Sequence, residues 1–451
     1  MKRFYVVIAL AAVLMLAGCG TKNQAEQPTS TPTVAAEPTL APTNTPEPTV
    51  TNTPTPTPEP TATNTPIPTP EPEVDWYTAM LQDSLVSAGN NARLKKVLEK
   101  TRNGEKVTIA LLGGSITEGA GPAKKTDGYA YQFVEAFQAA YGTGDNVFFV
   151  NAGLSGTPSS LGAIRYKKDV LDVLGTEPDL FIIEFAVNDW NEATKTRAYE
   201  SLVHDVLSQD NDAAVILLFA VSKSKWNVQS DYLPVGNHYD LPMVSIKDAI
   251  VEPFKNNKLT DAEFFADDYH PTKYGHTVMS DCLMNLLSVV DAEEAEEMAA
   301  VPETGKKGLD FKNVIMLESD VEYEGITIAP GSFTLKDSTI QGFGLSYQAS
   351  FPNNWKHDGT AGNESFTMTL TCKNLMLNYK TSSSQTFGEV EIYVDGTKVS
   401  SVNGYSAGGW NNCNVILLID EKEAAEHTVE LRMKEGQEKK EFTILSFGYT
   451  E

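Results

Sequence analysis

Three side chains in this sequence have the chemistry needed for acyl transfer: a serine hydroxyl, an imidazole and a carboxylate. Ser115 is a poor nucleophile until a neighbouring base removes its proton. His270 is a candidate base because imidazole titrates near neutral pH. Asp267 lies three residues before this histidine and can accept the second ring N–H, which fixes the tautomer. These residue types predict attack of Ser115 on a carbonyl carbon.

The segments around these side chains predict where strands end. Residues 106–112 are apolar and rich in β-branched side chains, as expected for a buried parallel strand. Gly113 and Gly114 then permit a tight turn, so Ser115 follows the carboxyl end of a strand, where open α/β sheets carry their chemistry. Strand-like runs also precede residues 151–157 and 186–189.

Four segments in chain order resemble the four sequence blocks of the SGNH (GDSL-type) hydrolase superfamily. They are residues 111–119, 151–157, 186–189 and 267–271. The resemblance covers about residues 104–291. It implies an oxyanion hole formed by the backbone N–H of Ser115, the backbone N–H of Gly153 and the side-chain amide of Asn188. Two positions depart from the family pattern, because Gly114 stands where Asp is usual and Ala186 where Gly is usual.

Each of these residues also has a purely structural interpretation. Ser115 can be a turn serine, and Asn188 can form a turn after a strand. Asp267 and its neighbour Asp268 can cap the helix that follows. The joint occurrence of the four segments in the family order favours the hydrolase interpretation.

Strand and helix patterns alternate between residue 75 and about residue 295. This alternation predicts an α/β fold with a parallel sheet covered on both faces, and the family resemblance implies the flavodoxin-like, three-layer form. We expect helices over residues 75–100, with a break at Gly89 and Asn90, and over residues 129–140, 159–174 and 196–208. A run rich in Ala and Glu at residues 291–303 is expected to close the last helix, and the domain is assigned to residues 75–300.

From residue 309 the pattern changes to short alternating runs separated by turns. Residues 390–400 predict a hairpin with its turn at Asp395 and Gly396. Residues 305–451 are therefore predicted to form an all-β sandwich of jelly-roll type. This part resembles the accessory jelly-roll domain of family 2 carbohydrate esterases, although there it precedes the SGNH domain. Whether it binds sugar or shapes the active site stays open.

The N-terminus predicts export. Residues 4–16 form an apolar run, after Lys2 and Arg3, that is too short to cross a bilayer as a helix. The run ends in a segment at residues 16–19 that resembles the bacterial lipobox, which implies a signal peptide at residues 1–18 and a lipid on Cys19. The protein would then be anchored on the extracellular face of the cell membrane; an ordinary secretory signal is the alternative. The Thr/Pro-rich residues 19–74 predict a disordered linker.

Charge and composition narrow the partners. The formal net charge of −25 argues against nucleic acid and anionic lipid surfaces but not against a neutral polysaccharide. Trp190, Arg165 and Trp410 are candidate substrate-binding residues, with packing, a surface ion pair and a core position as their respective alternatives. Metal-ligand spacings and nucleotide-binding motifs are absent from the sequence, so neither a metal nor a cofactor is expected.

The remaining cysteines predict little. Cys372 and Cys413 both lie in the β region and could form a disulfide, although spacing alone does not decide this. Cys282 falls on an apolar helical face and is expected to be a buried thiol. The oligomeric state stays open.

The sequence as a whole predicts a cell-surface serine esterase that removes O-acetyl groups from a polysaccharide of the xylan or mannan type. One alternative is an O-acetylesterase acting on peptidoglycan or exopolysaccharide, or a lipid esterase. A second alternative is a polysaccharide-binding lipoprotein with an inactive hydrolase domain. The presence of Ser115, Asp267 and His270 together argues against an inactive domain.

Overall fold

The computed structural model describes residues 74–340 and 351–451. The predicted signal peptide, the lipidation site Cys19 and the linker up to residue 73 lie outside the described residues. Within the described part of the chain, none of the helices is both long and apolar enough to cross a bilayer. Lipid anchoring therefore stays a prediction from the sequence.

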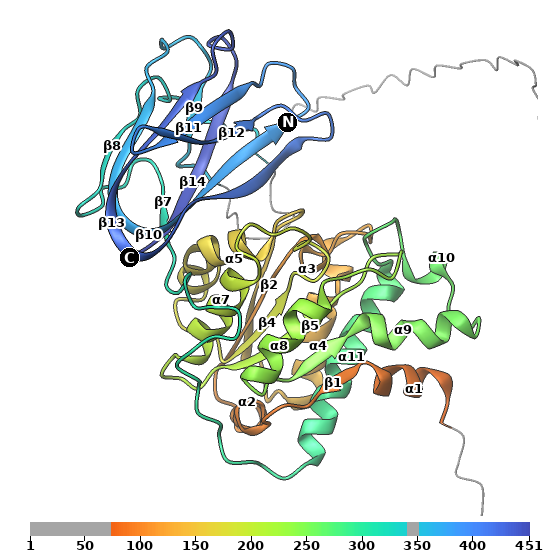
Figure 1. Cartoon of the computed structure of the whole chain (residues 1–451). Coiled ribbons are helices and arrows are strands. Elements are labelled where there is room, and N and C mark those ends of the chain that lie inside the picture. Colours follow the sequence, from red (N-terminus) through yellow and green to blue (C-terminus); the bar gives the residue numbers. More distant parts are fainter. Residues whose placement is uncertain (1–73, 341–350) are drawn as a thin grey trace, which may run out of the picture. The chain divides into compact units, whose positions relative to one another are not determined.

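The first part of the described chain, called the α/β domain below, contains a six-stranded sheet (Figure 1). Its strand order is β1-β6-β5-β4-β2-β3, and all neighbours pair in parallel except β1, which runs antiparallel to β6. The parallel strands follow the flavodoxin-like order. The strands are β1 Leu85–Ser87, β2 Val107–Gly113, β3 Val147–Gly153, β4 Leu180–Glu184, β5 Ala214–Phe219 and β6 Met243–Ser245.

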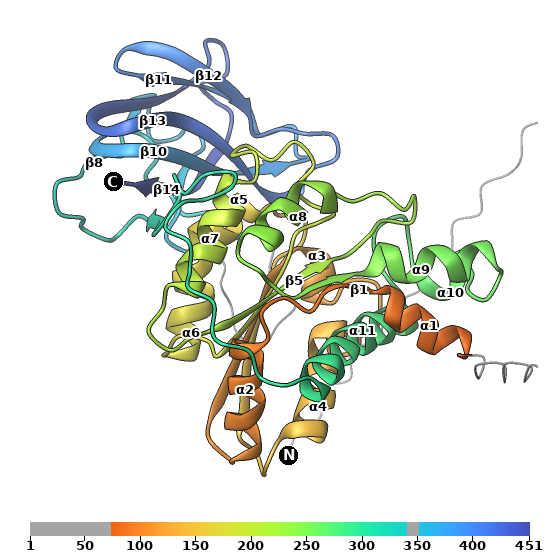
Figure 2. The same cartoon turned by 60° about the horizontal axis from the view of Figure 1, so that its bottom comes forward.

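Strand β2 explains why the sheet must be covered on both faces. All seven of its residues are buried. Ile109 and Leu111 pack into one core with α2, α4 and α11, whereas Ala110 and Leu112 pack into a second core with α7 and α8. Helices accordingly lie on both faces of the sheet (Figure 2). A strand between two cores needs a continuous apolar run, so the predicted three-layer α/β fold is confirmed.

The helices of the α/β domain surround the sheet. A 3₁₀ turn at Lys125–Asp127 precedes α4, and a π-helical turn at Lys167–Leu171 separates α5 from α6. The α-helices are α1 Trp76–Asp83, α2 Ala92–Arg102, α3 Ser115–Glu118, α4 Tyr129–Tyr141, α5 Ser159–Tyr166, α6 Asp172–Leu174, α7 Arg197–Leu207, α8 Gln229–His238, α9 Ile246–Lys255, α10 Asp261–Phe264 and α11 Lys273–Ala292.

The predicted interrupted helix over residues 75–100 is wrong in its middle. The structure has two helices, α1 and α2, but the short strand β1 lies between them. Leu85 pairs with Val244 and completes the edge of the sheet. A three-residue strand is too short to show a period, so its leucine also fitted the helical spacing of the apolar residues before it.

The expected helical end at residues 291–303 is also wrong, because α11 ends at Ala292. The Asn91 side chain donates to the carbonyl of Glu294 and accepts the N–H of Glu296, each at 2.9 Å. These contacts hold the segment in a non-helical conformation. The partner is some 200 positions away in the chain, and helix propensity does not include it.

The second part, called the β domain below, is all-β, as predicted, and the strands of its sheet pair antiparallel (Figure 1). The sheet has the order β12-β11-β13-β10-β14-β7, with β8 paired to β10 and β9 to β14. Asp395 and Gly396 both have positive φ in the turn between β11 and β12, which confirms the hairpin. The strands are β7 Ile315–Leu317, β8 Thr327–Ala329, β9 Trp355–His357, β10 Phe366–Ser382, β11 Glu389–Val394, β12 Thr397–Asn403, β13 Trp410–Met433 and β14 Phe442–Thr450.

No disulfide joins Cys372 and Cys413 in the described part of the chain. Cys413 on β13 lies opposite Lys380, whereas Cys372 lies opposite Ala425. The two sulfur-bearing residues therefore occupy distant positions along the same strand pair, and a disulfide cannot bridge them. Cys282 is a buried thiol, as predicted, and burial raises its pKa to about 12.

A separate apolar cluster joins the two domains. Ile164 of α5 packs against the β domain, and Gly448 of β14 approaches it so closely that a Cβ would lie 2.4 Å from Ile164 Cγ1. The buried members of the cluster are Leu154, Leu161, Ala163, Ile164, Ala198, Phe311, Phe351, Met376, Cys413 and Leu445.

Candidate active site

Ser115, His270 and Asp267 form one hydrogen-bonded chain. His270 Nε2 lies 2.8 Å from Ser115 Oγ, and His270 Nδ1 lies 2.8 Å from Asp267 Oδ2. The second carboxylate oxygen of Asp267 accepts the backbone N–H groups of Tyr269 and His270, each at 2.8 Å. This arrangement matches the nucleophile, base and orienting acid of an acyl-transfer site.

The environment keeps Asp267 ionised. Partial burial alone would raise its pKa, but the hydrogen bonds from His270 and from the two backbone N–H groups lower the pKa below its ordinary value. Asp267 is not the N-cap of the next helix. That role belongs to Thr272, whose hydroxyl accepts the N–H of Gly275 at the start of α11.

Ser115 begins the short helix α3 directly after β2. The preceding Gly114 donates its N–H to the carbonyl of Glu184 at 3.3 Å. A Cβ on Gly114 would lie only 2.0 Å from Asn188 Oδ1. In this structure a side chain at position 114 would therefore clash with the amide of Asn188.

Gly153 does not have the role that the family resemblance implied. Its N–H donates to Asn151 Oδ1 at 2.9 Å and so is already used within the protein. A Cβ at Gly153 would lie 2.1 Å from the backbone nitrogen of Glu118. The glycine is required, as predicted, for a close backbone approach, but the approaching group is helix α3 and not a substrate.

Gly156, three residues further along, has the features expected of an oxyanion donor, which Gly153 lacks. It is exposed and has a φ of 69°, and within the described residues its N–H makes no hydrogen bond. The carboxylate of Glu118 accepts the N–H of the preceding Ser155 at 2.8 Å and also its hydroxyl, which fixes this loop beside α3. The second glycine of segment 151–157 was the sequence signal for this residue.

Asn188 follows β4, where Asp189 anchors the chain. The buried Asp189 carboxylate accepts the N–H of Ser159 at 2.8 Å, the Ser159 hydroxyl, and the hydroxyl of Tyr232 at 2.6 Å. Burial, reinforced by the charge of Glu192, raises the pKa of Asp189. These contacts tie the residue after Asn188 to the start of α5.

Two of the three predicted substrate-binding residues are exposed. Trp190 is 71% exposed and Trp410 is 51% exposed. The edge of the Trp410 ring lies 3.0 Å from the position that a Cβ on Gly156 would occupy, so this side chain of the β domain borders the loop of the α/β domain. Tyr269 and Trp226 are also exposed, and neither was predicted as a candidate.

Arg165 is not placed to bind substrate, and that prediction is wrong. Its side chain is 1% exposed, donates to the carbonyl of Gly113 at 3.1 Å and forms an ion pair with Asp169 at 3.0 Å. The Arg165 side chain thus supports the carboxyl end of β2. Trp355 is likewise buried and belongs to the core of the β domain.

The described residues contain no group of three or more His, Cys, Asp or Glu side chains able to hold a metal ion. The residues that the structure brings together are a nucleophile, its base and an orienting acid, with the amide of Asn188 against Gly114. A serine activated in this way can form and hydrolyse an acyl-serine.

Comparison with known proteins agrees with this geometry. Residues 111–278 match the sequence model of the GDSL-like Lipase/Acylhydrolase family. A solved structure of a two-domain esterase (CEX) active on acetylated mannans is 26% identical, with a TM-score of 0.70 over 82% of this chain and 99% of that chain. Its counterpart co-crystallised with mannopentaose gives 26% identity and a TM-score of 0.69 over the same shares.

A catalytic mutant of an acetylxylan esterase from Geobacillus stearothermophilus is 16% identical, over 44% of this chain and 100% of that chain, with a TM-score of 0.34. A search of curated proteins found no match. The chain thus contains a GDSL-like lipase/acylhydrolase domain followed by an antiparallel β domain, in a fold similar to that of the two-domain esterase. The protein is a carboxylic ester hydrolase.

Proposed function

We propose that this protein removes O-acetyl groups from a mannan-type polysaccharide outside the cell. The observation that carries the reaction is the hydrogen-bonded chain from Ser115 through His270 to Asp267. The substrate class is supported by the similarity, over both domains, to an esterase active on acetylated mannans. The lipobox-like segment ending at Cys19 supports a location on the outer face of the cell membrane.

In the first half of the reaction, His270 Nε2 takes the proton of Ser115 Oγ as this oxygen attacks the acetyl carbonyl carbon. The carbonyl oxygen becomes an oxyanion. The N–H of Ser115, the N–H of Gly156 and the amide of Asn188 donate to it. When the tetrahedral intermediate collapses, His270 gives its proton to the leaving sugar oxygen, and acetyl-Ser115 remains.

In the second half, His270 removes a proton from water, whose oxygen attacks the acetyl-serine carbon. The new tetrahedral intermediate releases acetate, and the proton returns to Ser115 Oγ. Asp267 stays ionised throughout and stabilises the imidazolium that forms in both halves. Acetic acid ionises on release, so the reaction consumes one ester and one water and yields one alcohol, one acetate ion and one proton.

Exposed aromatic rings suit a neutral sugar, because the apolar face of a pyranose packs on them while its hydroxyls stay hydrated. Trp190 follows the proposed oxyanion donor Asn188 by two residues, and Trp410 borders Gly156. We propose that these two tryptophans line the sugar-binding side of the site. The negative charge of the chain does not oppose such a ligand.

Acetate release from acetylated mannan, acetylated xylan and acetylated peptidoglycan tests the proposal. The purified protein is expected to deacetylate mannan, and Ser115→Ala is expected to abolish release while the fold is retained. Release only from peptidoglycan would replace the proposed substrate with an envelope polymer. Release that persists in Ser115→Ala would remove the assigned nucleophile.

A further inference from the structure

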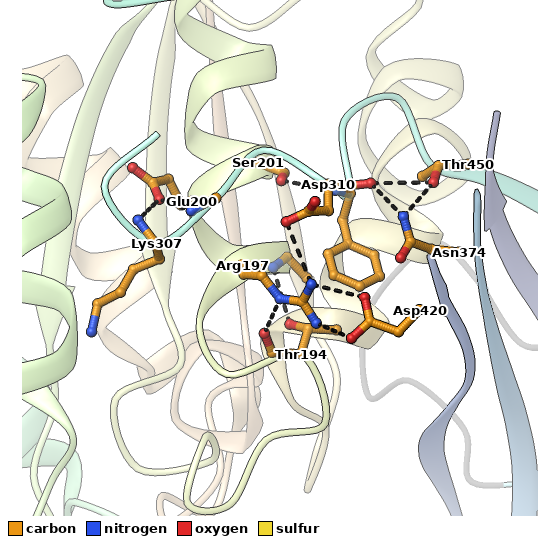
Figure 3. Close-up of polar contacts among 12 residues, drawn as sticks. Thr194, Arg197, Glu200, Ser201, Lys307, Asp310, Asn374, Asp420 and Thr450 are labelled. Atoms are coloured by element: carbon orange, nitrogen blue, oxygen red, sulfur yellow. Dashed lines mark hydrogen bonds and ion pairs between the residues drawn. The ribbon is translucent and has the colours of Figure 1, made fainter. Parts of the chain in front are cut away.

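Arg197 joins three parts of the molecule that are distant in sequence (Figure 3). It is the first residue of α7. Its guanidinium forms a bidentate ion pair with Asp420 of β13, at 2.8 and 2.7 Å, and its Nε donates to the carbonyl of Thr194 at 3.0 Å. Asp310, in the chain that leads into the β domain, lies 3.4 Å from Nη1. One side chain thus connects the β domain with the turn that precedes α7.

That turn is the end of the β4–α7 loop (residues 185–196), which carries Asn188 near its start. Asn191, Lys195 and Thr196 have φ values of 56°, 54° and 74°. A positive φ is uncommon for any residue with a Cβ and is an outlier for a β-branched threonine. Such conformations persist only where surrounding contacts hold them.

The contacts that hold the loop come from two directions. Inside the loop, the Glu192 carboxylate accepts the N–H and the hydroxyl of Thr194 at 2.9 and 2.8 Å, and the N–H of Thr196 at 3.3 Å. From outside the loop, the Nε of Arg197 donates to the carbonyl of Thr194. The other guanidinium nitrogens of Arg197 bind Asp420. The strained end of the loop is therefore fixed by a residue of the β domain.

The position of Asp420 does not depend on this ion pair alone. One turn further along α7, the buried Glu200 carboxylate accepts the backbone N–H groups of Lys306, Lys307 and Gly308, with 2.5 Å to Lys306 and 2.9 Å to Gly308. Figure 3 shows the contact between Glu200 and Lys307. Ser201 Oγ accepts the N–H of Phe311 at 3.1 Å. The chain entering the β domain is thus bound along α7. It is also bound to the strand pair that carries Asp420, because Asn374 of β10, which pairs with Asp420, donates its amide to the carbonyl of Asp310 at 2.9 Å.

From these contacts we infer that Arg197 is a positioning residue for the oxyanion hole. With Asp420 as its anchor, it holds the strained end of the β4–α7 loop and thereby the aim of the Asn188 amide. The β domain then supports turnover even of an ester that carries no sugar. The inference rests on the proposed ester hydrolysis, but not on which polysaccharide is the substrate. An amide donor is effective only when it is aimed at the developing charge.

The test uses 4-nitrophenyl acetate, which carries no sugar for the β domain to bind. We expect Asp420→Asn and Arg197→Lys to lower kcat about three- to tenfold and to leave KM nearly unchanged, since a misaimed donor affects the transition state. The substitution by lysine keeps the charge but cannot bind Asp420 with two nitrogens while also reaching the carbonyl of Thr194. Thermal unfolding of each variant reports whether the fold is kept, and Asp420→Asn alters a side chain that is 45% exposed.

Glu318→Gln is the matched control. It removes an ion pair with Lys168 that also joins the two domains but lies outside the β4–α7 loop, and kcat is expected to stay at the wild-type value. Unchanged kcat in both Arg197→Lys and Asp420→Asn would overturn the inference. An equal fall in Glu318→Gln would also overturn it, because any weakening of the domain contact would then suffice. Wild-type protein without activity on the small ester would instead overturn the esterase function itself.

Discussion

The two sides of Ser115 are built differently. On the base side, Asp267 and His270 lie in one exposed loop and are oriented by hydrogen bonds within that loop. On the side of the proposed oxyanion hole, Ser115, Gly156 and Asn188 come from three separate segments, each fixed by contacts with distant parts of the chain. A local motif thus suffices for the base, whereas the proposed oxyanion hole depends on tertiary structure.

Two carboxyl groups extend the contrast. Asp267 is 54% exposed, and its hydrogen bonds lower its pKa. Glu184, at the end of β4, is fully buried, and burial raises its pKa to about 8, although a hydrogen bond from Thr117 opposes the shift. At neutral pH the base side therefore carries the negative charge that stabilises an imidazolium. Glu184, whose backbone carbonyl accepts the N–H of Gly114, is mostly protonated and adds no negative charge at the end of β4.

The largest expected effect is on the base side. His270→Ala removes the proton acceptor and should lower kcat by at least about 10⁴-fold. Asp268→Asn is the matched control, since Asp268 follows Asp267 but only its backbone carbonyl makes a hydrogen bond in the described residues, to the N–H of Lys223. Single-turnover kinetics with a small acetyl ester would measure both. Substantial turnover in His270→Ala would show that another group acts as the base.

On the oxyanion side, Asn188→Ala should lower kcat on the order of 10²- to 10³-fold, the usual cost of removing one donor. KM should change much less, because the amide is needed mainly in the transition state. Steady-state kinetics on the small ester and on acetylated mannan should give the same ratio. A kcat within twofold of wild type would exclude Asn188 from the oxyanion hole.

The two glycines of segment 151–157 should respond in opposite ways. Gly153→Ala forces a Cβ against the backbone of α3 and should lower the melting temperature sharply. Gly156→Ala meets only the edge of Trp410 but strains a positive φ, and should stay folded with kcat lowered about tenfold. If Gly153→Ala were instead stable and inactive, the original assignment of Gly153 to the oxyanion hole would be restored.

The smallest effect should come from Glu184→Gln, and it concerns stability. Because the folded pKa of Glu184 exceeds its ordinary value of 4.5, the folded state binds more protons than the unfolded state between about pH 4.5 and pH 8. Stability should therefore fall as pH rises through this window. The glutamine variant lacks this contribution, so its melting temperature should fall less than that of wild type between pH 5 and pH 8. If the melting temperatures of wild type and Glu184→Gln fell equally between pH 5 and pH 8, Glu184 would not have a raised pKa in the folded protein.

Local patterns predicted much of the fold and the base side of the site. Strand β2 was recognisable because a strand buried on both faces needs an unbroken apolar run. Asp267 and His270 were recognisable because they stand in the last of the four family segments, at a spacing that lets the two side chains meet. Short elements with no period of their own, such as β1, were missed.

The remaining features depend on contacts between distant residues. Both Gly153 and Gly156 fit a requirement for glycine, and only the partners Asn151 and Glu118 distinguish them. Arg165 was considered as a substrate-binding or surface residue, but its partner Gly113 places it inside the fold. Each assignment depends on which groups share a neighbourhood, and spacing along one segment does not contain that information.

The turn that wraps the Glu200 carboxylate has a consequence for protein engineering. Accessory domains are often exchanged as if a flexible linker alone connected them to the catalytic domain. Here the connecting segment from Lys306 to Gly308 packs on the α/β domain, because its backbone N–H groups donate to the buried Glu200 carboxylate. A chimera that replaces the β domain must therefore keep this turn, or substitute Glu200 as well, to avoid leaving a buried charge without partners.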